Sequence, residues 1–210
     1  MAGGFFLVLE GPEGSGKTTL ATGLAAWLRA RGIEPLLARE PGGTPVAEAL
    51  RRELLDTDRR WTPEMELLYI ATARADHVTR VIRPALEAGR VVICDRFELS
   101  TRAYQGAGRG LPEALVESFN RAATGGLRPD LTLILDLPPE AGMARLHANG
   151  RAQNRLDQES LGFHRRVAAR YQAEQGPGVV HLDAAVAPAD LVTQAVRALE
   201  AHRPALTSAS

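Results

Sequence analysis

The segment GPEGSGKT at residues 11–18 fits the pattern GxxxxGK[ST], with Lys17 and Thr18 at its end. A short apolar run precedes it and a helical pattern follows it, and in that context the pattern forms a phosphate-binding loop. Backbone N–H groups of such a loop turn toward phosphate oxygens, Lys17 adds positive charge, and the Thr18 hydroxyl is a ligand for Mg²⁺. We therefore expect a nucleoside triphosphate site. The residues that we assign to its phosphates are Gly11, Pro12, Glu13, Gly14, Ser15, Gly16, Lys17, Thr18 and Thr19.

Glu13 stands out in this loop because its carboxylate opposes the negative charge of a bound phosphate. The sequence allows two interpretations of this residue. Glu13 either points into solvent, away from the phosphates, or faces a second ligand that the loop itself does not hold.

A second acidic position, Asp95, closes the apolar run RVVICD at residues 90–95. A carboxylate at the carboxyl end of a buried strand is well placed to hold Mg²⁺, although Asp95 also suits the cap of a following helix. Asp136 closes a similar run, LTLILD, but prolines at 138 and 139 favour a cap or turn there. We therefore assign the metal to Thr18 and Asp95.

Short apolar runs alternate along the chain with longer stretches of helical spacing. The runs expected to form strands are Phe5–Glu10, Pro35–Arg39, Arg90–Asp95, Leu131–Asp136 and Gly178–Asp183. The expected helices are Thr18–Ala30, Pro63–Ala88, Pro112–Thr124, Pro139–Ala148, Ser160–Gln175 and Pro188–Ala201. The strands are apolar almost throughout, as strands buried on both faces are. The alternation predicts an α/β fold with a doubly wound five-stranded parallel sheet flanked by helices.

Length and composition limit the classes of protein. The chain has 210 residues without a repeat, which suits one domain, placed here at 1–203 with a flexible tail at 204–210. Its 25 basic and 25 acidic residues balance, so we expect neither a nucleic-acid polymer nor a membrane as partner. The single cysteine, Cys94, suits a reducing compartment and a buried strand, and the start lacks the basic segment of a signal peptide. We expect a cytoplasmic protein with small-molecule substrates.

Several classes of protein share the phosphate loop. A GTPase switch needs Asp-x-x-Gly after a strand and Asn-Lys-x-Asp, whereas Asp95 is followed by RFEL and Lys17 is the only lysine. A motor or AAA-type ATPase is normally longer. The remaining class is a small kinase, in which arginines hold a second anion beside the transferred phosphoryl group. The arginines that could form this anion site are Arg39, Arg51, Arg74 and Arg96.

Several longer strings resemble the bacterial thymidylate kinase family, in the subtype with its catalytic arginine in the lid. They are REPGGT at 39–44, DRF at 95–97, STRAYQGAGRG at 100–110 and RLDQES at 155–160. With the phosphate loop, the resemblance spans the chain from Phe5 to about Asp183. It implies a P-loop kinase fold that transfers the γ-phosphoryl group of ATP to dTMP, giving dTDP and ADP for dTTP synthesis. It also implies Mg²⁺ and a homodimer.

The resemblance implies a role for each residue of the acceptor site. The residues implied to bind dTMP are Glu13, Arg39, Glu40, Pro41, Arg51, Ile70, Arg74, Arg96, Thr101, Tyr104 and Gln105. In the family, a carboxylate at the Glu13 position binds the 3′-hydroxyl, and an arginine at the Arg51 position reaches the monophosphate. Arg74 is expected to bond a thymine carbonyl, and Thr101 and Gln105 are expected to bind the base edge near N3.

Three further acceptor residues carry particular expectations. Arg96 is expected to bridge the acceptor phosphate and the transferred group, and Tyr104 to lie beside C2′ and disfavour a ribose hydroxyl. The family usually places phenylalanine four residues before the Arg74 position, where this chain has Ile70. Ile70 either packs against the base without ring stacking or belongs to the helix core, and the sequence leaves both open.

A polar, glycine-containing stretch at about 149–157 is expected to form a mobile lid, because a closing loop excludes water and adds charge at the reacting group. The phosphate loop contains no arginine, so the resemblance assigns the catalytic arginine to the lid. Arg155 matches that position best, and Arg151 is the second candidate. The expected catalytic residues are therefore Lys17, Arg96, Arg155 and Arg151.

Two other functions stay open on the sequence alone. One is a deoxynucleotide or nucleoside kinase of broader specificity. The other is a P-loop nucleotide-binding switch without catalysis, against which the set of Lys17, Thr18, Asp95 and the arginines argues.

Overall fold

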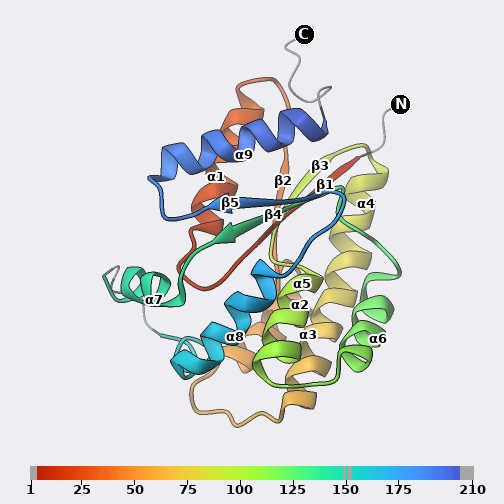
Figure 1. The fold of residues 1–210 in the computed structure, drawn as a ribbon. Helices are drawn as coiled ribbons and strands as arrows, with labels where there is room; N and C mark the ends of the chain where they lie inside the picture. Colours follow the sequence, from red (N-terminus) through yellow and green to blue (C-terminus); the bar gives the residue numbers. More distant parts are fainter. Residues whose placement is uncertain (1–3, 149, 151–152, 204–210) are drawn as a thin grey trace.

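The computed structural model describes residues 4–148, 150 and 153–203, and it shows a five-stranded parallel sheet with helices on both faces (Figure 1). The strands are β1 (Phe5–Glu10), β2 (Leu36–Arg39), β3 (Val91–Asp95), β4 (Leu131–Asp136) and β5 (Val179–Asp183). Their order across the sheet is β2-β3-β1-β4-β5, so β1 pairs with β3 on one side and β4 on the other. The predicted fold class and its five strands are confirmed.

The expected burial of the strands holds at the centre of the sheet and fails at its edges. All of β1 is buried, as is β3 from Val91 to Cys94. The edge strand β2 alternates between half-buried and exposed positions, and Leu37 is 43% exposed. The other edge strand, β5, is buried only at Leu182. An edge strand has a neighbour on one side alone, so an apolar run does not guarantee two-sided burial.

Helices cover both faces of this sheet. They are α1 (Lys17–Arg29), α2 (Pro45–Leu55), α3 (Pro63–His77), α4 (Arg83–Glu87), α5 (Glu98–Thr101), α6 (Glu113–Thr124), α7 (Pro139–Ala148), α8 (Leu161–Gln172) and α9 (Pro188–His202). Helices α1 and α9 lie together over one face (Figure 1). Their Leu24 and Leu199 pack in one core with Leu7 of β1. On the opposite face Ile82 packs against Val8. Alternate side chains of β1 thus belong to two separate hydrophobic cores.

The long helix predicted at Pro63–Ala88 is present, with a π-helical turn in its middle. Helix α3 runs into η1 (Val78–Ile82), which runs into α4. The Thr62 hydroxyl caps α3 by accepting the N–H group of Met65 at 3.3 Å, and Pro63 occupies the first turn. None of the helices in the described part of the chain is long and apolar enough to cross a membrane.

Two helical regions of the structure are not among those that periodicity predicts. Helix α2 buries only Ala47 and Leu54, and the Thr44 hydroxyl caps it. Helix α5 has 4 residues and continues into a second π-helical stretch, η2 (Arg102–Gly108). Both regions carry site residues. Of the expected lid at 149–157, residues 149, 151 and 152 lie outside the described residues, as does the expected tail at 204–210.

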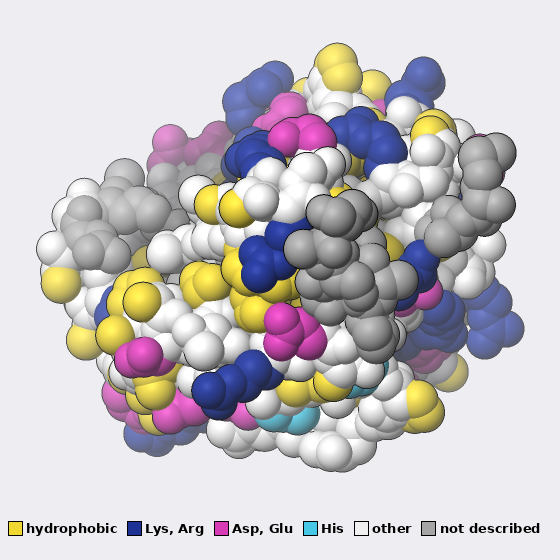
Figure 2. All heavy atoms as spheres, turned by 90° about the horizontal axis from the view of Figure 1, so that it is seen from above, with side chains coloured by type: hydrophobic (Ala, Val, Ile, Leu, Met, Phe, Trp, Pro, Cys, Tyr) yellow, Lys and Arg dark blue, Asp and Glu magenta, His cyan; other side chains and the backbone are white. Residues whose placement is uncertain are grey.

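The space-filling view shows basic and acidic side chains interspersed over the face seen from above (Figure 2). This distribution agrees with the equal numbers of basic and acidic residues in the chain.

Candidate active site

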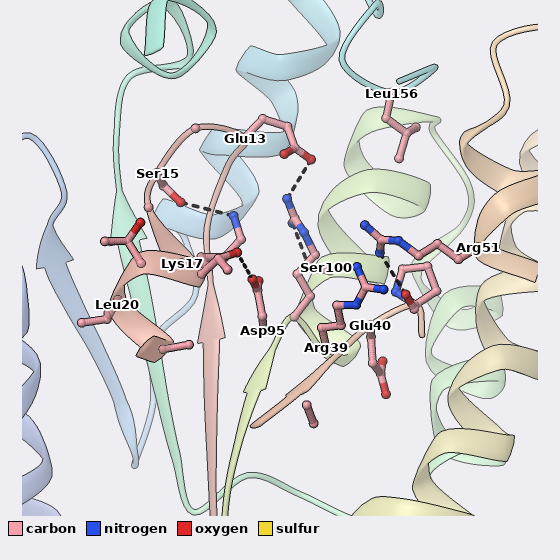
Figure 3. A pocket seen from close by; sticks show the side chains of 18 of the residues that line it. Glu13, Ser15, Lys17, Leu20, Arg39, Glu40, Arg51, Asp95, Ser100 and Leu156 are labelled. Atoms are coloured by element: carbon pink, nitrogen blue, oxygen red, sulfur yellow. Dashed lines mark hydrogen bonds and ion pairs between the residues drawn. The ribbon is translucent and has the colours of Figure 1, made fainter. Parts of the chain in front are cut away.

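A cavity of about 1030 Å³ opens where the carboxyl ends of the strands meet (Figure 3). Its walls come from the phosphate loop, the β2–α2 loop, α2, α3, the end of β3, η2 and residues near the lid. Every residue predicted to bind the acceptor lines it: Glu13, Arg39, Glu40, Pro41, Arg51, Ile70, Arg74, Arg96, Thr101, Tyr104 and Gln105. The cavity also includes Glu13 to Thr19 of the phosphate loop, whereas Gly11 and Pro12 do not line it.

The phosphate loop has the backbone that its glycines predict. Gly14 and Gly16 have φ angles of 71° and 93°, a left-handed conformation that a residue with a Cβ rarely adopts. Lys17 begins α1 and folds back, so that its Nζ donates to the carbonyls of Gly11 at 3.0 Å and Pro12 at 2.8 Å. Burial, with the positive charge of nearby Arg96, lowers the pKa of Lys17 to about 8. Lys17 is therefore a poorly solvated cation at the floor of an anion site.

The two predicted metal ligands meet beside the loop. The Thr18 hydroxyl donates to Asp95 Oδ2 at 2.8 Å. Neutral and carboxylate oxygens are the donors that Mg²⁺ prefers, so this pair fits the ion. Asp95 does not cap a helix, because α5 begins only at Glu98. Asp136 lies apart from the cavity lining and bonds His181 Nδ1 at 2.8 Å, which is neither a helix cap nor a metal contact.

Arg96 directly follows Asp95 and has a strained backbone. Its φ angle is 73°, the only positive value among the described residues other than glycine. Its Nη2 donates to Glu13 Oε1 at 2.8 Å and to the Tyr104 hydroxyl at 3.1 Å. The Tyr104 hydroxyl also donates to Glu13 at 3.1 Å. Glu13 thus points across the cavity toward Arg96 and not into solvent, which favours the second interpretation of this residue (Figure 3).

Behind Arg96 lies a buried carboxylate, Glu10, that the sequence interpretation missed. Its Oε1 accepts the backbone N–H groups of Phe97 at 2.8 Å and Ser100 at 3.1 Å. Its Oε2 accepts the hydroxyls of Ser100 at 2.6 Å and Tyr171 at 3.2 Å. Both hydroxyl oxygens in turn accept from Arg96 Nη1, at 3.2 and 3.1 Å. Burial raises the pKa of Glu10, and the bonds to Ser100 and the charge of Arg96 oppose that shift.

Two more arginines bring positive charge to the same end of the cavity. Arg39 Nη2 donates to both carboxylate oxygens of Glu48 at 2.9 Å, and Arg51 Nη1 donates to the carbonyl of Pro41 at 2.9 Å. Burial, then repulsion from Arg39, lowers the pKa of Arg51. Figure 3 shows both guanidinium groups facing the space opposite Lys17 and Asp95. We call this region, with Lys17 and Arg96, the phosphate end of the cavity.

Arg74 is almost fully buried, at 2% exposure, and its position is set by protein groups. Its Nε donates to Glu40 Oε2 at 2.6 Å, its Nη1 to Thr101 and Asn120 at 2.8 Å, and its Nη2 to the carbonyl of Phe97 at 2.8 Å. Both oxygens of Glu40 therefore have protein partners, since Oε1 lies 3.3 Å from His77 Nδ1. In this structure Glu40 supports Arg74 instead of presenting a free carboxylate to a ligand.

Glu40, His77 and Cys94 place donor atoms within 4.8 Å of one another, a spacing that could hold a metal ion. A metal at Nδ1 of His77 would force the ring proton onto Nε2. Among the described residues no acceptor faces that buried atom. We therefore interpret the group as hydrogen-bonded support, with the His77 Nδ1–H group donating to Glu40.

We call the other end of the cavity, lined by Ile70, Thr101 and Gln105, the base end, after the ligand that the resemblance implies there. Ile70 is 9% exposed and lines the cavity, so it is available to pack against a ligand. Gln105 Nε2 donates to Glu66 Oε2 at 3.1 Å, and Gln105 Oε1 is buried without a hydrogen-bond partner among the described residues. Glu66 is a second buried carboxylate that the sequence interpretation missed.

Arg155 takes a position that sequence alone does not indicate. Its Nη1 pairs with Glu66 Oε1 at 2.7 Å, and its Nε donates to the carbonyl of Leu54 at 3.0 Å. Its neighbours Asn154 and Leu156 line the cavity, whereas Arg155 does not. The other lid candidate, Arg151, lies outside the described residues.

The missed residues share one signal that was available in the sequence. Glu10 is a charged residue at the end of an apolar strand, directly before the phosphate loop, and Glu66 stands among apolar residues of a helix. A carboxylate in such a position is buried only when donors surround it. The donors come from segments distant in sequence, so the pattern marks the carboxylates but not their partners.

Comparisons with known proteins agree with this geometry. A family model described as thymidylate kinase matches residues 9–196. The chain is 50% identical to a thymidylate kinase of Thermomicrobium roseum over 91% of this chain and 92% of that protein. It is 48% identical to one of Desulfovibrio desulfuricans over 94% and 95% of the two chains. The crystal structure of a thymidylate kinase from Ehrlichia chaffeensis superposes with a TM-score of 0.77 at 28% identity, over 94% and 99% of the two chains. The chain belongs to the thymidylate kinase family.

Proposed function

We propose that this enzyme transfers the γ-phosphoryl group of ATP to dTMP and releases ADP and dTDP. The observation that carries the proposal is one cavity that joins a phosphate loop to a second cluster of positive charge. Two polyanions can meet there without repulsion, because Lys17 faces one side and Arg39 and Arg51 face the other. Arg96 adds charge beside the phosphate loop, where it bonds Glu13 and the carbonyl of Gly11. Membership of the thymidylate kinase family supports dTMP as the acceptor.

Catalysis in this proposal rests on positioning and on charge neutralisation, because the acceptor phosphate oxygen is already ionised. Lys17 and the N–H groups of the loop hold the donor phosphates, and Arg96 reaches the acceptor phosphate and the transferred group. Thr18 and Asp95 would hold Mg²⁺, which neutralises charge on the phosphate oxygens when bound. The burial of Lys17 and the partial burial of Arg96 strengthen their electrostatic effect relative to water.

The acceptor sugar and base have their own proposed contacts. Glu13 accepts the 3′-hydroxyl, and the Tyr104 ring fills the space beside C2′. Arg74, held by its protein partners, contacts a thymine carbonyl, while Thr101 and Gln105 face the N3 edge. Glu40 acts through Arg74, and Ile70 packs against the base. Pro41 forms part of the cavity wall, and its carbonyl accepts a hydrogen bond from Arg51.

Arg155 and Arg151 are the proposed lid arginines. To reach a phosphoryl group, Arg155 must leave Glu66 and the carbonyl of Leu54. Arg109 stays with Glu66 at 2.8 Å, so the departure would not leave a buried carboxylate without a cation.

We also propose a cytoplasmic location and a homodimer. Exposed apolar side chains of Met65 and Leu68 on α3, and of Val46 on α2, support a partner surface there. Mass measurement by light scattering at micromolar concentration would test the dimer, and a monomeric mass would contradict it.

A panel of phosphate acceptors tests the proposed reaction. With ATP and Mg²⁺, ADP release is measured with dTMP, dUMP, UMP, dCMP, dGMP and thymidine. We expect dTMP to give the highest kcat/KM. Equal values for dTMP and dCMP would favour a deoxynucleotide kinase of broader specificity. A lack of stimulation by every acceptor would favour a nucleotide-binding switch without catalysis.

A further inference from the structure

Gln105 and Glu66 form a buried pair at the base end of the cavity. Glu66, on α3, has 0% exposure, and its Oε2 accepts an N–H group of Gln105 at 3.1 Å. Gln105, on η2, lines the cavity at 1% exposure, and its Oε1 has no hydrogen-bond partner among the described residues. A buried carbonyl oxygen without a donor costs free energy, so this atom is suited to accept a bond from a ligand.

Glu66 leaves the Gln105 amide one favourable orientation. A carboxylate only accepts hydrogen bonds, so Gln105 must turn its NH₂ group toward it. The reversed amide would place one acceptor against another in a buried site, where neither has water. Glu66 cannot turn away, because Arg109 Nε and Nη2 hold its oxygens at 3.0 and 2.8 Å and Arg155 Nη1 holds one at 2.7 Å. The amide oxygen is therefore directed away from Glu66, as the buried acceptor of a residue that lines the cavity.

We propose that Glu66 determines which bases the cavity accepts, by fixing Gln105 as a hydrogen-bond acceptor. The inference rests on the proposed function, in which Gln105 faces N3 of the acceptor base. N3 of thymine and of uracil carries a proton and donates, whereas N3 of cytosine accepts. Gln105 Oε1 therefore matches the first two bases and opposes the third. Glu66 is a positioning residue, which acts on the base only through Gln105.

Glu66→Gln tests this role with a nearly isosteric change. The new side chain can keep its oxygen on Arg155 Nη1 and Arg109 Nη2 and turn its NH₂ group to Gln105, at the cost of the bond from Arg109 Nε, and Gln105 then reverses its own amide. We expect the ratio of kcat/KM for dTMP to that for dCMP to fall by about tenfold or more. The ratio of dTMP to dUMP should stay within about twofold, because both bases donate from N3. An unchanged dTMP to dCMP ratio would overturn the proposal.

Arg155→Met is the matched control, since it removes another partner of Glu66 and leaves Gln105 in place. It should slow all acceptors alike and leave the dTMP to dCMP ratio as it is. Thermal unfolding of both variants shows whether they lose similar stability. If Arg155→Met shifts the dTMP to dCMP ratio as far as Glu66→Gln does, a general disturbance of the contacts around Glu66 explains the result and the proposal fails.

Gln105→Met provides a second route if Glu66→Gln does not fold. It removes both polar atoms of the amide, so cytosine no longer meets an opposing acceptor, and the dTMP to dCMP ratio should again fall by about tenfold. A dTMP to dCMP ratio as high in this variant as in the wild type would overturn the proposal. A wild-type enzyme that does not phosphorylate dTMP would instead refute the proposed function. Normal dTMP activity with unchanged ratios in both variants would refute this inference alone.

Discussion

Two buried carboxylates, Glu10 behind Arg96 and Glu66 behind Gln105, support the two ends of one cavity in different ways. Glu10 receives only uncharged donors directly, two hydroxyls and two backbone N–H groups. Glu66 pairs directly with two guanidinium groups, those of Arg109 and Arg155. The charge of Glu10 is therefore balanced by one cation, Arg96, which reaches it only through two hydroxyl groups. Glu66 has two cations, so it keeps one if either Arg109 or Arg155 moves away.

In the proposed reaction, this difference implies a separate task for each end. At the phosphate end, Ser100 and Tyr171 turn their hydroxyl protons toward Glu10, so their lone pairs face Arg96 Nη1. This arrangement fixes the guanidinium in place, as charge neutralisation of a transferring group requires. At the base end, Glu66 fixes only the polarity of an amide. We expect changes at Glu10 to lower the rate with every acceptor, and changes at Glu66 to alter the choice of acceptor.

Arg96→Ala should give the largest effect and tests the phosphate end directly. Removing a preorganised charge from the transferred group should lower kcat by about 10³-fold, with KM for ATP much less affected. The assay is steady-state ADP release below the unfolding temperature of the variant, with circular dichroism as the check on folding. Arg96→Lys is the matched variant, which keeps the charge and loses the planar fork. A folded Arg96→Ala enzyme with near-normal kcat would remove Arg96 from the mechanism.

Glu10→Gln should give the next largest effect, although Glu10 does not line the cavity. With its NH₂ group on the backbone N–H groups, the new side chain opposes two donors. With that group on the two hydroxyls, it turns their protons away from residue 10, so the negative charge and the hydroxyl arrangement that hold Arg96 are lost. We expect kcat to fall by about 10- to 100-fold for dTMP and dUMP alike, since a small displacement of a catalytic group is costly.

Glu98→Gln is the control for Glu10→Gln. Glu98 is also buried, at 7% exposure, but it pairs with Arg102 and Arg128, away from Arg96. It should lower the unfolding temperature and leave kcat within about twofold, as expected for a purely structural ion pair. An equal loss of kcat in both variants would mean that destabilisation, and not the orientation of Arg96, limits the Glu10 variant.

How far the sequence predicts this site depends on the kind of partner that each residue needs. The sequence predicts that Lys17, Thr18 and Asp95 lie together, because their spacing along a strand, loop and helix determines where they meet. Their roles stay predictions. The five strands follow from apolar runs for the same reason. The residues that the resemblance implies for the acceptor all line one cavity. Some of them lie on α2 and η2, which periodicity alone did not indicate as helices.

The rest depends on contacts between distant segments. Glu10 meets Tyr171 from α8, and Arg155 pairs with Glu66 from α3, separations of 161 and 89 residues. No local pattern specifies these pairs, because they require the whole fold to bring buried donors and acceptors together. For the same reason the sequence could assign Glu40 to the ligand but could not show that Arg74 and His77 occupy both of its oxygens.

The pH dependence of Lys17 tests how strongly the phosphate end is desolvated. Its pKa of about 8, against an ordinary 10.5, means that the free enzyme loses this charge above pH 8. We expect kcat/KM for ATP to fall by about tenfold per pH unit above that point. Stability from this group should rise with pH between about 8 and 10.5, because the unfolded chain then binds the extra proton.

Because Lys17 is the only lysine, ¹³C-lysine labelling gives one side-chain signal whose titration reports this group alone. A midpoint near 10.5 would show that the phosphate end is solvated in the free enzyme. In that case Lys17 would not be a buried cation, and the phosphate end would no longer differ in this respect from the base end, where Arg109 and Arg155 are paired with Glu66.

Glu13→Ala should give the smallest effect, because Arg96 keeps its bonds to the hydroxyls of Ser100 and Tyr171 when the Glu13 carboxylate is removed. It accepts from Arg96 at 2.8 Å and from the Tyr104 hydroxyl at 3.1 Å, and in the proposed complex it also accepts the 3′-hydroxyl of dTMP. Loss of that last bond should raise KM for dTMP by about threefold to tenfold, the range of one hydrogen bond to a ligand. KM for ATP should change by less than about twofold, since the loop N–H groups remain. Initial rates with each substrate varied in turn separate the two constants, and 3′-deoxy-dTMP, which lacks the hydroxyl, should bind the wild type and the variant equally. A larger rise in KM for ATP than for dTMP would place Glu13 with the donor phosphates, as the loop pattern alone suggests.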